Sequence, residues 1–82
     1  MGKDKKMIKR EILEKFRSIS PEEDYILPPQ WLESDYMPGL TTYERKILKQ
    51  AINELISLGL IENVKGSRLN LKLTEKGANL LS

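Results

Sequence analysis

The chain has 82 residues, of which 39% are hydrophobic and 32% are charged, and its net charge is +2. This length allows one small domain with one core, so residues 1–82 are expected to form a single domain in which residues 1–4 are flexible. The sequence contains no cysteine and no histidine. This excludes disulfide bonds, thiolate nucleophiles, imidazole catalysis and zinc sites with those ligands, so we expect no metal and no cofactor.

No segment of the sequence predicts attachment to a membrane. No apolar run reaches the roughly 18–20 residues of a membrane span, and the charged start is not followed by the apolar region of a signal peptide. Position 6, where a myristoylation signal needs Ser or Thr, is Lys6. We therefore expect a soluble, cytoplasmic protein.

Charge is segregated along the chain. Residues 1–17 carry seven bases and three acids, residues 18–44 carry six acids and no base, and residues 45–82 carry seven bases and three acids. Folding can bring the two basic segments together on one face, but the average charge alone does not predict nucleic-acid binding.

The first predicted element is a helix over residues 4–19. Its apolar side chains recur at steps of three and four and form one stripe, which comprises Ile8, Ile12, Leu13, Phe16 and Ile19. Glu11 and Lys15 stand four residues apart and are expected to pair on the outside. Pro21 ends the helix, because proline cannot continue the hydrogen-bond ladder and restricts the residue before it.

A short strand and a short helix are predicted next. Residues 25–27 (Tyr-Ile-Leu) are prone to form a strand, which could join a sheet formed elsewhere in the chain. Pro28-Pro29 suits the start of a helix, where a missing amide hydrogen does no harm. We therefore expect a second helix over residues 30–36, ended by a turn at Pro38-Gly39.

A long amphipathic helix over residues 42–58 is the best-defined element. Thr41 and Glu44 match the capping box, in which each side chain binds an otherwise unpaired backbone amide. Gly59 is placed to take the left-handed conformation that ends a helix. The expected apolar side of this helix comprises Ile47, Leu48, Ala51, Ile52, Leu55, Ile56 and Leu58.

A hairpin and a closing helix complete the chain. Residues 60–64 and 68–73 are strand candidates on either side of Lys65-Gly66-Ser67, and apolar residues alternate with polar ones from Leu69 to Leu73. Thr74 is the expected N-cap of a final helix over residues 75–81. Ala78 and Leu81 are expected to turn inward.

Two runs in the second half resemble winged helix-turn-helix regulators of the MarR and PadR kind. These runs are Leu55-x-x-Leu58-Gly59-Leu60-Ile61 and, after the hairpin, Leu73-Thr74-Glu75-Lys76-Gly77. The resemblance implies an α+β, mostly helical fold with a three-helix core, a small antiparallel hairpin wing and a short C-terminal helix. The order of the predicted elements in the first half fits this fold too. In such regulators the long helix enters the major groove of DNA.

The resemblance and the helical pattern together indicate which residues would touch DNA. Opposite the apolar side of helix 42–58, no acid interrupts positions 45–53. Lysine and arginine suit phosphate or guanine contacts, whereas glutamine and asparagine can pair with adenine edges. The expected DNA-binding residues of this helix are Thr42, Tyr43, Arg45, Lys46, Lys49, Gln50 and Asn53. A polar side opposite an apolar side is also what any surface helix shows.

Two further basic groups allow two interpretations each. Lys65 and Arg68 flank the turn 65–68, where a wing would reach a minor groove or a phosphate, but charged residues are common at any exposed turn. The N-terminal bases would form either a flexible arm that adds salt-dependent affinity or a frayed, solvated terminus. They are Lys3, Lys5, Lys6, Lys9 and Arg10.

The acidic and aromatic region 22–36 supports an alternative function. Trp31 and Tyr36 are either partly buried core residues or contacts for a partner, and Glu22-Glu23-Asp24 is either a solvated loop or a docking surface for a basic protein. The alternative is therefore a winged-helix protein–protein interaction module that uses this region.

The expected function is sequence-recognising or general binding of double-stranded DNA by a small transcriptional regulator. An enzyme is not expected, because the glycines form no phosphate-binding loop and the carboxylates are scattered. No small-molecule effector is evident. If binding is specific, we expect a homodimer formed through the first or last helix, since one short module buries too little surface for tight operator recognition.

Overall fold

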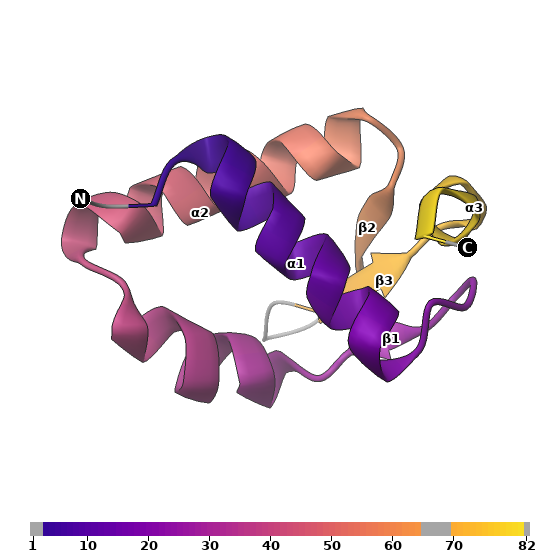
Figure 1. Cartoon of the computed structure of the whole chain (residues 1–82), viewed down its shortest axis with the longest axis horizontal. Coiled ribbons are helices and arrows are strands. Elements are labelled where there is room, and N and C mark those ends of the chain that lie inside the picture. The colour runs from indigo at the N-terminus through magenta and orange to yellow at the C-terminus, as the bar shows by residue number, and fades with distance from the viewer. Residues whose placement is uncertain (1–2, 65–69, 82) are drawn as a thin grey trace.

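The structure, a computed structural model, describes residues 3–64 and 70–81 (Figure 1). The part of the chain that it describes is α+β and mostly helical, as predicted. Its elements, in chain order, are α1 (Lys5–Ile19), β1 (Ile26–Leu27), η1 (Trp31–Tyr36), η2 (Met37–Gly39), α2 (Thr42–Ser57), β2 (Ile61–Val64), β3 (Asn70–Leu73) and α3 (Glu75–Leu81).

Helix α1 packs with the apolar stripe that its sequence predicts. Asp4 caps its start by accepting a hydrogen bond from the backbone amide of Met7 (2.7 Å), and the side chains of Ile8, Ile12 and Phe16 are fully buried. Ile19 was expected on this stripe, but 44% of its surface is exposed. The last turn of α1 therefore extends beyond the core.

The predicted pair between Glu11 and Lys15 does not form, because both side chains find other partners. Glu11 accepts hydrogen bonds from the ammonium group of Lys3 (3.0 Å) and from the hydroxyl group of Tyr36 (3.1 Å). The ammonium group of Lys15 lies 5.3 Å from the centre of the Trp31 ring. Contacts between α1 and η1 thus replace the contact along the helix.

The predicted second helix is present, but it is a π-helix, η1, followed by a single 3₁₀ turn, η2. The backbone amide of Met37 donates to the carbonyl of Leu32, five residues earlier, which is the wide spacing of a π-helix. Leu32 and Tyr36 are buried on the inner side of η1. The sequence pattern predicted that this segment is helical but not which kind of helix it forms.

Helix α2 is capped as its sequence predicts. The Oγ1 atom of Thr41 accepts from the amide of Glu44 (3.1 Å), and the Glu44 carboxylate accepts from the amide of Thr41 (2.8 Å). Gly59, just past the end, has a φ of +77°, the left-handed conformation. Leu58 was expected on the apolar side, but 47% of its surface is exposed, because it lies at the end of the helix rather than over the core.

The three described strands form an antiparallel sheet in the order β1-β3-β2. Ile26 of β1 pairs with Lys72 of β3, and Glu62 of β2 pairs with the same residue from the other side. Leu27, Leu71 and other apolar side chains on one face of the sheet are buried in the common core. The predicted strand of residues 25–27 therefore joins the hairpin to make one sheet.

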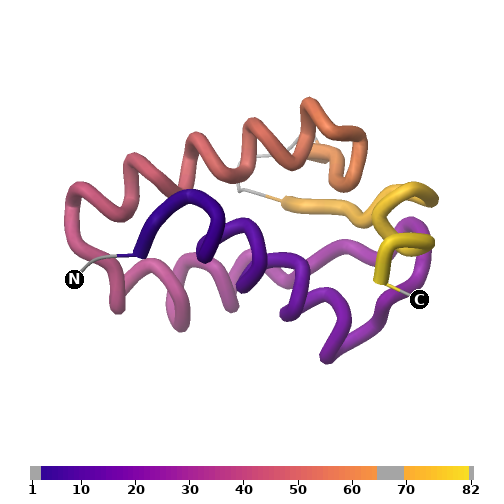
Figure 2. Tube along the Cα trace, turned by 45° about the horizontal axis from the view of Figure 1, so that its top comes forward, coloured from indigo at the N-terminus to yellow at the C-terminus, as the bar shows by residue number. Residues whose placement is uncertain are grey.

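The helices complete the core around this sheet. Figure 2 shows α2 along one long edge of the molecule, with η1 and η2 along the opposite edge. Thr74 caps α3, as predicted, by accepting from the amide of Gly77 (3.1 Å), and its hydroxyl group donates to the carbonyl of Gly59. Ala78 and Leu81 pack against the core. Within residues 3–64 and 70–81, no helix is both long enough and apolar enough to cross a membrane.

Candidate nucleic-acid interface

The seven α2 residues predicted to touch DNA are all exposed on one side of the helix. We call them the polar face of α2, which comprises Thr42, Tyr43, Arg45, Lys46, Lys49, Gln50 and Asn53. The apolar side of α2 faces the core, where Leu48, Ala51 and Leu55 are buried. Tyr43 is the most exposed large hydrophobic side chain among the described residues, at 69%. The polar face therefore projects from the domain as an accessible surface.

The bases of the polar face carry no ion pair with any described residue. Arg45 donates only to a backbone carbonyl, that of Met37 (3.3 Å), and neither Lys46 nor Lys49 lies within ion-pair distance of a carboxylate in the described parts of the chain. Lys72, by contrast, lies 3.6 Å from the Asp24 carboxylate and 3.5 Å from that of Glu62. The positive charge on the polar face is thus available to an external anion.

The two acids of α2 are held on other sides of the helix. Glu44 is 7% exposed, and hydrogen bonds from the backbone amides of Thr41 and Lys3 keep the pKa of its carboxyl below the usual range. Because this carboxylate lies in the first turn of α2, it offsets part of the positive end of the helix dipole.

Glu54 contacts α1 rather than the polar face. Its carboxylate accepts from the ammonium group of Lys9 and lies 2.8 Å from that of Lys5. These two hydrogen-bonded ammonium groups lower the pKa of Glu54 to about 2. The side of α2 that faces α1 therefore contains one carboxylate held by two lysines.

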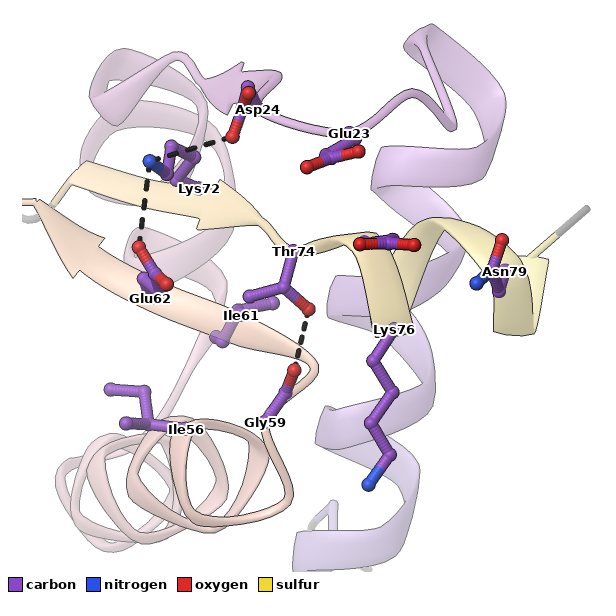
Figure 3. A pocket seen from close by; sticks show the side chains of 11 residues that line it. Glu23, Asp24, Ile56, Gly59, Ile61, Glu62, Lys72, Thr74, Lys76 and Asn79 are labelled. Atoms are coloured by element: carbon purple, nitrogen blue, oxygen red, sulfur yellow. Dashed lines mark hydrogen bonds and ion pairs between the residues drawn. The ribbon is translucent and has the colours of Figure 1, made fainter.

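The acids nearest the start of β1 lie at the opposite end of α2 from Lys46. Glu23 and Asp24 line an open groove of about 720 Å³, together with residues of β3 and α3 such as Lys72 and Lys76 (Figure 3). Helix α2 reaches this groove only through Ile56 near its end. These two acids therefore do not cover the polar face of α2.

The aromatic pair of η1 is built into the contact between η1 and α1. Tyr36 is 9% exposed, and its ring centre lies 5.0 Å from that of Trp31. Burial, and then the adjacent carboxylate of Glu11, raise the pKa of the Tyr36 hydroxyl above its ordinary value. Trp31 is partly exposed beside a shallow hollow of about 360 Å³.

The N-terminal bases are anchored from Lys3 onward. The backbone amide of Lys3 donates a hydrogen bond to the Glu44 carboxylate (2.6 Å), and the ammonium group of Lys3 lies 4.8 Å from the centre of the Tyr36 ring. Lys5 and Lys9 hold Glu54, as described above. Neither the flexible arm nor the frayed terminus that the sequence suggested describes residues 3–10, because Lys3 is bonded to Glu44 and residues 4–10 form the capped start of α1.

One part of the surface was not predicted from the sequence. Asn63 of β2 and Met37 of η2 border, with Lys49 and Asn53, a groove of about 270 Å³ whose floor is apolar. No sequence signal could have indicated Asn63, because only the position of the hairpin against α2 brings it beside the polar face.

The predicted wing residues lie in the sequence between β2 and β3. These two strands are paired from Ile61 with Leu73 to Val64 with Asn70. Lys65 and Arg68 fall outside the described residues, so their role stays a prediction. Comparisons of the chain with known protein families, with curated proteins and with solved structures found no match.

Proposed function

We propose that this chain is a winged helix-turn-helix domain that binds double-stranded DNA, with α2 in the major groove and the hairpin as the wing. The order of elements supports the fold: a helix, a short strand, a second helical segment, a long helix and a hairpin follow one another. The sheet supports it too, since β1 pairs with the second strand of the hairpin and so closes the core beneath it.

One observation carries the proposed function. The polar face of α2 has three bases without an acidic partner among the described residues, together with the amides of Gln50 and Asn53, on the exposed side of the helix. Unpaired bases suit the phosphates and guanine, and the amides suit adenine edges. A helix of this diameter fits the major groove, which is about 12 Å wide.

The alternative, a protein–protein interaction module, has less support. It relied on Trp31, Tyr36 and the acids of region 22–36. The hydroxyl group of Tyr36 is bonded to Glu11, and Asp24 is paired with Lys72. Trp31, the other aromatic residue on which this alternative relied, is partly exposed.

The test is a binding assay with a labelled random-sequence DNA duplex at low and at moderate salt. We expect the wild-type protein to bind at low salt and the triple variant Lys46→Ala, Lys49→Ala, Gln50→Ala to bind much more weakly. These three side chains are exposed, so the variant should keep its fold, which circular dichroism will check.

A matched control removes two bases from other surfaces. Lys15 lies against Trp31 and Lys76 lies on α3, so the double variant Lys15→Gln, Lys76→Gln should bind DNA almost as the wild type does. Absence of binding by the wild type at low salt would refute the proposed function. Equal losses in the control and the triple variant would refute the role of α2.

Use of the domain as a transcriptional regulator implies a specific site and a second copy of the chain. We propose that such a homodimer would form through α1 or α3. Sedimentation of the protein with and without DNA would measure its oligomeric state, and a monomer in both conditions would refute this part of the proposal.

A further inference from the structure

Two further bases without an ion pair lie on α1, outside the polar face of α2. Lys6 and Arg10 are exposed, stand four residues apart and therefore share one side of the helix, with Cβ atoms about 5–6 Å apart. Neither has an ion-pair partner in the described parts of the chain, unlike Lys5, Lys9 and Arg17 of the same helix.

A shallow hollow of about 210 Å³ lies between these two bases, and Asp4 and Met7 complete its lining. Among the described residues, Asp4 supplies the one carboxylate that lines it, and this carboxylate accepts a hydrogen bond from the backbone amide of Met7 as the helix cap. The two bases outnumber this one carboxylate, so the charge around the hollow is net positive and favours an anion.

Lys6 and Arg10 form a basic strip of α1, which lies next to the contact between α1 and α2. Lys6 and Arg10 each follow by one residue a lysine that reaches Glu54 of α2, so each lies about 1.5 Å further along the helix and about 100° further round it. The bond from the Lys3 amide to Glu44 holds the start of α1 against the start of α2. The orientation of the strip relative to α2 is thus fixed by contacts at two points.

We propose that Lys6 and Arg10 contact the phosphate backbone of DNA beside the groove that α2 enters. The inference rests on the proposed function and adds to it a second, sequence-independent contact on a different helix. Glu54, the acid of α2 at its contact with α1, is held by two lysines, so its charge is compensated within the described part of the chain. The phosphates of a duplex line the edges of the major groove. A helix packed beside α2 therefore lies close to them when α2 enters the groove.

The test compares the salt dependence of DNA binding between variants. For a random-sequence duplex, each phosphate contact contributes about 0.9 to the slope of log affinity against log salt. We expect the double variant Lys6→Gln, Arg10→Gln to bind with a shallower slope, whose magnitude is smaller by about 1.8. The charge-conserving variant Lys6→Arg, Arg10→Lys should keep the wild-type slope, and Lys15→Gln, Lys76→Gln should change it little.

The outcomes separate this inference from the proposed function. An unchanged slope for Lys6→Gln, Arg10→Gln, in a protein that binds DNA through α2, refutes the inference and leaves the proposed function intact. The same fall in slope for the control variant also refutes it, because net charge alone would then explain the loss. A wild-type protein that does not bind at low salt overturns both, and thermal unfolding will check that each variant is folded.

Discussion

Gly77 shows how a single residue fixes the position of α3. A Cβ atom placed there would lie 2.2 Å from the carbonyl oxygen of Leu60 and 2.7 Å from a methyl group of Leu73. We expect Gly77→Ala to lower the free energy of unfolding by about 1–3 kcal/mol, since backbone must move to relieve the overlap. Denaturant unfolding at equilibrium measures this change.

Gly39 provides the matched control for Gly77. A Cβ atom at Gly39 would meet no atom within 4 Å. Gly39→Ala should therefore leave stability unchanged or raise it slightly, by about 0.4–1 kcal/mol, through the loss of freedom in the unfolded chain. Equal losses of stability in the two variants would show that the close approach at Gly77 is not the cause.

Glu54 should make the stability of the domain depend on acid pH. Its pKa is lowered to about 2 in the folded protein from an ordinary value of 4.5. The stabilisation is therefore complete above about pH 4.5 and is lost as the pH falls toward about 2. We expect Glu54→Gln to be less stable than the wild type at neutral pH and to lose less stability across this range.

Thermal unfolding at several pH values measures the effect of Glu54. The control is Glu22→Gln, which changes an exposed acid that has no ion pair with a described residue. A pH dependence in the Glu54→Gln variant that parallels the wild type would contradict the role assigned to Lys5 and Lys9.

At the scale of elements, the start of α2 depends on the capping box. Thr41→Ala removes the side-chain acceptor for the amide of Glu44 and should lower the free energy of unfolding by about 1 kcal/mol. Thr42→Ala, one residue further on, should change it by less than about 0.5 kcal/mol, because this exposed side chain caps nothing. Chemical denaturation of both variants gives the comparison, and an equal effect would contradict the cap.

The sequence predicted most elements because their signals are local. The capping box at Thr41 and the glycine stop at Gly59 each involve residues within a few positions of one another. Two of the errors lie where a helix extends past the core. Ile19 and Leu58 fit the apolar period, yet both are exposed, since periodicity gives the side of a helix but not where its neighbours end.

At the scale of the whole molecule, the distribution of unpaired bases predicts how strongly DNA binding depends on salt. Five exposed bases without an acidic partner among the described residues lie on α1 and α2, namely Lys6, Arg10, Arg45, Lys46 and Lys49. If each neutralises one phosphate, log affinity should fall with log salt with a slope of about −4.5. Fluorescence anisotropy titrations over a range of salt concentrations measure the slope, and a value near zero would contradict electrostatic binding.

The sequence by itself determined the order of helices and strands, the caps, and the polar side of α2, because these follow from the spacing of neighbouring residues. Only the tertiary structure decided which charges remain unpaired. Glu54 is held by Lys5 and Lys9, more than forty residues away, and Lys72 holds Asp24, whereas Lys6 and Lys46 have no such partner among the described residues. Ion pairs between segments that are distant in the sequence depend on how the helices pack, and no local sequence pattern encodes this packing.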